Sequence, residues 1–160
     1  MALTKFNFNS FDLTTAASKG LAFNSSANGF ETAAEGSMTL IKTLTASSSS
    51  TLSFVHGSSD VVLDSTYPVY LFKFINIHPA SDNTEFQFNG SDDDSSHSYD
   101  VTKTTTFYRA YHDEGDSGTA LEYQTGKDLA QGTGFQRLTA GQHNASDAAH
   151  SGTILIFNPS

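Results

Sequence analysis

The densest group of side chains that could bind a metal ion is the acidic run Asp92, Asp93 and Asp94. Hard cations such as Ca²⁺ take about six to eight oxygen ligands, which carboxylates can supply. The run lacks the spaced Asp-x-Asp-x-Asp pattern of a calcium loop, and neighbouring strand residues point to opposite faces. We therefore interpret it as a solvated hairpin loop, with a cation site as the alternative.

A second group of ionisable side chains is His-Asp-Glu-Gly-Asp at residues 112–116. Glycosidases place two carboxylates roughly 5–10 Å apart around a sugar, but adjacent acidic residues are also common in ordinary loops. The chain has no Trp to stack on a sugar ring, so Tyr or Phe would have to replace it. We interpret this segment as a solvated loop as well.

The remaining reactive side chains are scattered along the sequence. No two of the six His have the spacing of a metal-binding pair on one helix or strand; they are His56, His78, His97, His112, His143 and His150. A Gly-x-Ser-x-Gly nucleophile motif is missing, and the absence of Cys excludes thiolate zinc sites, cysteine nucleophiles and disulfides. We therefore predict a protein that is not an enzyme, with no catalytic residue, cofactor or metal.

Two cations, Lys73 and Arg109, lie inside otherwise apolar and aromatic segments. A buried cation needs an anionic partner, because the loss of its hydration is costly. Two alternatives follow for each residue: a contact at an interface or in a buried ion pair, or an edge position from which the charge reaches water. We keep Lys73 and Arg109 as candidate interface residues.

Charge excludes several classes of partner. The 160 residues include 8 Lys and Arg against 17 Asp and Glu, a net charge of −9. Binding to nucleic acid or to anionic lipid needs an excess of basic side chains. We also expect no signal peptide at the N-terminus and no membrane span, since the longest apolar stretch is short and contains Lys73.

The composition favours an all-β protein. Ser, Thr, Phe and Tyr are frequent, and no long stretch has the apolar spacing of a helix. Alternating or apolar stretches predict strands at residues 38–45, 52–56, 69–77, 85–89, 99–112, 121–123 and 153–157. Residues 69–77 are apolar on both faces, which predicts a central strand covered on each side. The expected fold is an antiparallel β-sandwich, with a jelly roll as one form of it.

The N-terminal residues 1–36 differ from the rest. Phe6, Phe8 and Phe11 lie among polar residues, and residues 24–29 have the composition of a loop. Two interpretations remain open for this part: a loosely ordered segment, or an extended arm whose Phe side chains pack on a neighbouring subunit. The expected organisation is therefore an arm over 1–36 and one β-sandwich domain over 37–160.

Four stretches resemble small virion structural proteins of marine tailed phages: residues 41–54, 67–82, 106–112 and 155–160. The resemblance covers residues 38–160 and implies a non-enzymatic, β-rich component of the virion. Such chains usually continue into further strands after the Asn-Pro-Ser segment, so we expect either a short version or a missing C-terminal portion.

From these features we expect a capsid decoration protein on the particle surface. Its partners would be the major capsid protein or tail proteins, with further copies of itself in a homo-oligomer, a trimer being favoured. The alternatives are a component of a tail or head appendage or fibre, and a carbohydrate-binding module for a host glycan. The last idea depends only on the fold, since β-sandwiches include many lectins.

Overall fold

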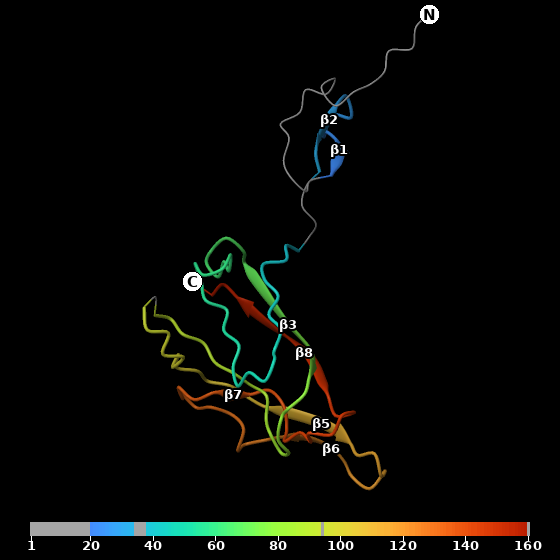
Figure 1. Cartoon of the computed structure of the whole chain (residues 1–160), viewed down its shortest axis with the longest axis vertical. Coiled ribbons are helices and arrows are strands. Elements are labelled where there is room, and N and C mark those ends of the chain that lie inside the picture. Colours follow the sequence, from blue (N-terminus) through green and yellow to red (C-terminus); the bar gives the residue numbers. More distant parts are fainter. Residues whose placement is uncertain (1–19, 34–37, 94, 160) are drawn as a thin grey trace, which may run out of the picture. The chain divides into compact units, whose positions relative to one another are not determined.

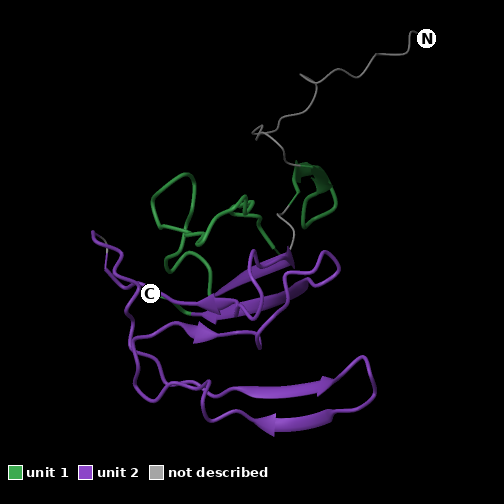
Figure 2. Ribbon diagram, turned by 60° about the horizontal axis from the view of Figure 1, so that its bottom comes forward, with its two compact units in different colours: residues 1–68, 158–160 green, residues 69–157 purple. Residues whose placement is uncertain are grey.

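The computed structural model describes residues 20–33, 38–93 and 95–159 (Figure 1). These residues form an all-β structure, as the composition predicted, and they contain no helix that could cross a membrane. The chain divides into two compact units, 1–68 with 158–160 and 69–157, which Figure 2 shows in different colours. The expected arm boundary at residue 36 lies outside the described residues.

Within the first unit, the described strands form one small hairpin. Strands β1 (Leu21–Phe23) and β2 (Phe30–Thr32) pair antiparallel. The loop predicted at residues 24–29 is confirmed as the turn between them, closed by a hydrogen bond from the Asn24 amide to the Gly29 carbonyl. The rings of Phe23 and Phe30 stack across the pair at 4.9 Å.

The second unit contains three antiparallel pairs of strands. β3 (Val69–Ile77) pairs with β8 (His150–Phe157), β4 (Gln87–Phe88) with β7 (Gln136–Arg137), and β5 (Tyr108–His112) with β6 (Thr119–Tyr123). The first pair joins residues at the two ends of the unit, because Val69 lies opposite Phe157. The strands expected at 69–77, 121–123 and 153–157 are thus confirmed, and β8 begins three residues earlier than predicted.

A bulge interrupts β3 near its end. The register with β8 shifts between Phe74 and Ile77, and Asn76 has a φ of 55°. Asn adopts this left-handed region more readily than most residues, and the Ser151 hydroxyl accepts a hydrogen bond from the Asn76 amide at 2.9 Å. The bulge ends the regular alternation, so Ile77 is less exposed than Ile75.

Two expected strands, at residues 38–45 and 52–56, were predicted wrongly, because neither segment forms a strand in the structure. The long strand expected at 99–112 is confirmed only for β5. Alternation of apolar and polar residues indicates which side chains share a face, but a strand also needs a neighbouring backbone for its ladder of hydrogen bonds. The side chains of Met38 and Leu40 at the start of the segment are 75% and 82% exposed.

The prediction that residues 69–77 form a central strand covered on both faces is also wrong. Among the described strands, β3 is paired with β8 alone, and the side chains on one of its faces, Val69, Leu71, Lys73 and Ile75, are exposed. Tyr70 of that face is 3% exposed and, with Val61 of the other unit, is one of the two hydrophobic residues that are buried in the described chain. Burying both apolar faces of a strand requires a packed layer on each side, and the described residues provide such a layer on one side only.

Candidate interaction surface

The most unusual feature of the second unit is the exposed, apolar face of the β3–β8 pair. We call it the β3–β8 outer face and define it as Val69, Leu71, Lys73, Ile75, Leu155 and Phe157. The register places Val69 opposite Phe157 and Leu71 opposite Leu155. Ile75, Leu155 and Phe157 are 67%, 53% and 66% exposed. Cross-strand neighbours on one face lie close together, so Val69, Leu71, Leu155 and Phe157 form one apolar strip, and the pair Lys73 and Thr153 separates it from Ile75.

Packing on the opposite face holds this strip in place. There Tyr70, Phe72 and Phe74 lie opposite Ile156, Ile154 and Gly152. The Phe74 ring lies 4.8 Å from the ring of Phe86, which precedes β4. A Cβ on Gly152 would lie only 2.7 Å from Phe74 Cζ, so the glycine leaves the space that this ring occupies.

Lys73 lies in the middle of the β3–β8 outer face, opposite Thr153. It is exposed, so it is not part of a buried ion pair. The described residues contain no ion pair to Lys73, which makes it a cation surrounded by exposed apolar side chains. Its prediction as an interface residue is neither confirmed nor contradicted by this position.

The β5–β6 pair carries a second exposed face, the β5–β6 outer face, which we define as Tyr108, Leu121 and Tyr123. Tyr108 lies opposite Tyr123, and their ring centroids are 5.2 Å apart with the planes inclined by 41°. Leu121 is 81% exposed. Tyr111 lies on the other face of this pair, so Tyr108 and Tyr111 do not form one platform.

Arg109 lies on that opposite face and meets its counter-charge within the chain. Its guanidinium pairs with Glu122, directly across the ladder, and lies 4.4 Å from the centre of the Tyr111 ring. Both members of the ion pair are about one-third exposed. Arg109 thus forms an ion pair that is only partly buried, and its role as an interface residue stays a prediction.

Two carboxylates lie beside the β5–β6 outer face, one at each end. Asp128 accepts a hydrogen bond from the Tyr123 hydroxyl, which raises the pKa of Tyr123. At the other end of the pair, Asp116 lies 2.9 Å from His112 Nε2. The turn between the strands is organised by Asp113, whose carboxylate accepts bonds from the side chain and amide of Ser117. These bonds lower the pKa of Asp113.

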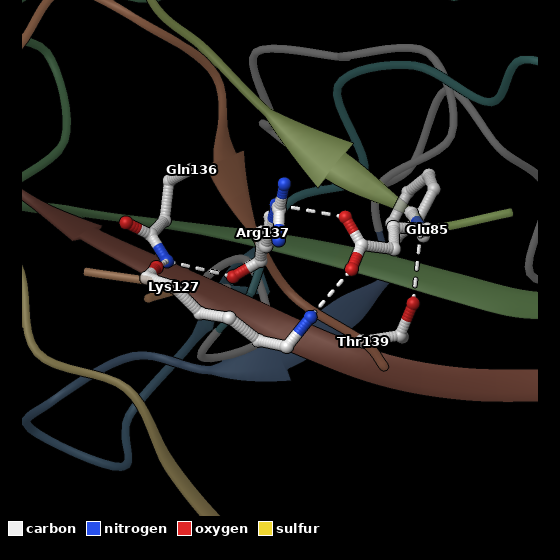
Figure 3. A network of polar contacts seen from close by, with 6 residues as sticks. Glu85, Lys127, Gln136, Arg137 and Thr139 are labelled. Atoms are coloured by element: carbon white, nitrogen blue, oxygen red, sulfur yellow. Dashed lines mark hydrogen bonds and ion pairs between the residues drawn. The ribbon is translucent and has the colours of Figure 1, made fainter. Parts of the chain in front are cut away.

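A polar network fixes the β4–β7 pair and the loop that leads to it (Figure 3). Glu85 Oε1 lies 2.5 Å from Lys127 Nζ, and Glu85 Oε2 lies 2.8 Å from Arg137 Nε. Gln136, which is 8% exposed, donates from its amide to the carbonyls of Lys127 and Arg137. In addition, the Phe86 amide donates to the Thr139 hydroxyl at 2.9 Å. The network is a scaffold whose charged members are satisfied by one another.

The acidic run at residues 92–94 is organised around Asp93; Asp94 lies outside the described residues. The Asp93 carboxylate accepts hydrogen bonds from the Ser98 amide and hydroxyl, the Ser91 hydroxyl and the His97 amide. These bonds hold the pKa of Asp93 far below its usual range. No group of three His, Asp or Glu residues suited to a metal ion occurs in the described chain.

His150, one of the six His that showed no metal-binding spacing, is a half-buried ionisable residue of β8. Its ring packs against Phe74 and Phe86, with centroid distances of 5.9 and 5.1 Å. Both ring nitrogens are buried without a hydrogen-bond partner among the described atoms. Burial, with a smaller effect of His78, lowers the pKa of His150. The sequence held one signal of this burial: His150 alternates in step with Gly152, Ile154 and Ile156, which share its face of β8.

The remaining predicted interface residues, Phe6, Phe8 and Phe11, lie outside the described residues. The candidate site is therefore a pair of exposed faces in one compact unit, aliphatic on β3–β8 and aromatic on β5–β6. Comparison of the chain with models of protein families, with curated proteins and with solved structures finds no match.

Proposed function

We propose that this chain is a non-enzymatic structural protein of a phage particle that acts by docking on other proteins as a capsid decoration protein. The observation that carries this proposal is the β3–β8 outer face. Burying one side chain such as Leu, Ile or Phe favours a contact by about 1.5–3 kcal/mol. Four such exposed apolar side chains, Val69, Leu71, Leu155 and Phe157, form two neighbouring cross-strand pairs on this face, and Ile75 is exposed beyond Lys73.

Contiguous apolar surface of this kind marks sites where another protein binds. The inner packing of Phe74 against Phe86 keeps the face presented in one conformation, so little ordering is required when a partner arrives. A preformed apolar surface with a single charge fits a permanent contact in an assembly.

The choice of a virion rests on the sequence. Residues 38–160 resemble small phage structural proteins, and the net charge of −9 suits a protein exposed on a particle surface. The proposed partners are the major capsid protein or tail proteins together with further copies of the chain, a trimer being favoured. We also propose that β3–β8 and the β4 region belong to facing sheets of an antiparallel sandwich, because Phe74 and Phe86 pack between them.

Imaging of particles whose genome encodes this chain tests the proposal. Antibody-gold labelling or a density map should place the protein over the whole capsid surface. Label confined to the tail or to one vertex would contradict decoration and favour the appendage alternative. Absence of the protein from purified particles would contradict a structural role.

Carbohydrate binding is a second candidate, favoured by one observation. Tyr108 and Tyr123 form an exposed aromatic pair beside the Asp128 carboxylate, and sugars bind to aromatic rings flanked by hydrogen-bond acceptors. Glycan-array binding that Tyr123→Ala abolishes and Tyr111→Ala preserves would support it, because Tyr111 lies on the opposite face. Lack of binding to any glycan would remove this candidate.

A further inference from the structure

We propose that copies of this chain associate head to tail, with the β3–β8 outer face of one copy against the β5–β6 outer face of the next. This inference rests on the proposed function, that the chain works by protein association, and names the partner as a second copy. Both faces belong to one compact unit, 69–157, so each copy presents both halves of the contact.

Charge complementarity is the first argument for this pairing. Lys73 is the one charged residue of the β3–β8 outer face. The β5–β6 outer face has carboxylates beside it, Asp128 at Tyr123 and Asp116 at His112. Opposite charges set the register of an interface, whereas like charges placed together are costly. Pairing two β3–β8 outer faces would bring two copies of Lys73 together in apolar surroundings.

The composition of the two faces is the second argument. One face consists of aliphatic side chains and Phe157, and the other has two Tyr and a Leu that is 81% exposed. Aromatic residues, Tyr in particular, are enriched in the buried centre of protein interfaces. An isolated two-stranded pair such as β5–β6 is also only marginally stable in water, and packing against a neighbouring copy would supply the missing cover.

A contact between two different faces has a consequence for symmetry. Each added copy leaves one face of each kind open until the last copy meets the first, so the assembly closes into a ring if the rotation permits. A ring with all faces covered has no free apolar strip. This geometry agrees with the homo-oligomer of the proposed function.

Mixing two variants tests the inference. Leu71→Asp places a charge on the β3–β8 outer face, and Leu121→Asp does so on the β5–β6 outer face. We expect each variant alone to sediment at the monomer mass of 17.1 kDa. An equimolar mixture should sediment at twice that mass, because each variant retains the face that the other has lost. Thr102→Asp, at an exposed position outside both faces, is the matched control and should assemble as the wild type does.

A second pair of variants guards against failure to fold. Lys73→Glu and Asp128→Lys reverse single charges and leave every apolar side chain of the two faces in place, and each should weaken association about fivefold to tenfold. The two variants mixed should recover affinity to within about twofold of the wild type. Circular dichroism and a cooperative unfolding transition establish that all variants are folded.

Three results would overturn the inference. The first is formation of the wild-type assembly by Leu121→Asp alone, which would mean that two β3–β8 outer faces meet. The mixtures could remain monomeric while the controls assemble. Finally, a monomeric wild type that binds a glycan through Tyr123 would assign the β5–β6 outer face to sugar. If the wild type is a monomer in solution but coats particles, head-to-tail association is contradicted and the proposed function stands. If the chain is absent from particles, the proposed function itself is contradicted.

Discussion

Asp93 is a single carboxylate that organises a whole loop. It accepts bonds from Ser91, His97 and Ser98, and these bonds lower its pKa. An unfolded Asp has a pKa near 3.9. Because the folded pKa is lower, the stabilisation is fully present above about pH 4 and is lost as the pH falls below that value.

We therefore expect Asp93→Asn to increase amide hydrogen exchange at His97 and Ser98 at pH 7. The wild type should lose the same protection only in acid, below about pH 4. Hydrogen–deuterium exchange measured by mass spectrometry checks both statements. Asp92→Asn is the control, since Asp92 is exposed beside the same loop. Equal exchange in both variants would show that Asp93 does not hold the loop.

His150 predicts a different pH dependence, near neutrality. Its pKa is lowered by burial, while an unfolded His titrates near 6.5. The unfolded chain therefore binds the proton more readily, and stability falls as the pH decreases through about 6.5. We expect His150→Phe to reduce the loss of melting temperature between pH 7.5 and 5.

The control for this measurement is His143→Gln, because the His143 side chain is 83% exposed. It should retain the acid sensitivity of the wild type. If His150→Phe retains that sensitivity as well, another group is responsible for it.

Gly152 is required by its neighbour across the ladder. A Cβ at this position would lie 2.7 Å from Phe74 Cζ, and the Phe74 ring is held by Phe86 and His150. Overpacking of this kind costs about 1–3 kcal/mol, so Gly152→Ala should lower the free energy of unfolding by that amount in urea titrations. Gly126→Ala has open space around it and should change stability by less than about 0.5 kcal/mol. Similar values for both variants would contradict this account.

On the scale of elements, the Glu85 network joins the β4–β7 pair to the preceding loop. Replacing Glu85 with Gln leaves Lys127 and Arg137 without their common counter-charge. Glu85 and Lys127 are only 16% and 17% exposed, so we expect a loss of about 1–3 kcal/mol in the free energy of unfolding. Urea unfolding at a fixed protein concentration measures it.

Glu114→Gln is the matched control, because Glu114 is exposed in the β5–β6 turn. It should leave the unfolding midpoint within error of the wild type. A stable Glu85→Gln variant would mean that the network does not stabilise the pair.

The strands could be predicted where apolar side chains follow the two-residue period of a strand. The apolar alternation of residues 69–77 and 153–157 located β3 and β8, and residues 121–123 located most of β6. The same alternation at residues 38–45 failed, because no local pattern states whether a neighbouring backbone is present. The register between β3 and β8 could not be predicted either, because it pairs Val69 with Phe157, which lie at opposite ends of the unit in the sequence.

The candidate site was predictable in part for a related reason. Lys73 and Arg109 stood out as cations in apolar segments, but only the structure shows that Arg109 pairs with Glu122 while Lys73 stays exposed. The apolar character of both faces of residues 69–77 was correct. The prediction that both faces are buried failed. Burial of a face depends on which other segment packs against it, and a local apolar pattern does not show whether such a segment exists.

At the scale of the whole molecule, the sequence carries more apolar surface than its described fold covers. Seven of the fourteen exposed Leu, Ile, Phe and Tyr side chains of the described chain lie on the β3–β8 and β5–β6 outer faces, while only two hydrophobic residues of the described chain are buried. Under the proposed function, association removes these faces from water and thereby lowers the free energy of the chain.

The most direct measurement is a near-atomic map of the phage particle that, under the proposed function, contains this chain. The account predicts that Leu71, Leu155 and Phe157 lie against another protein chain there, shielded from solvent. A map in which these three side chains face water, while the protein attaches through another surface, would contradict it.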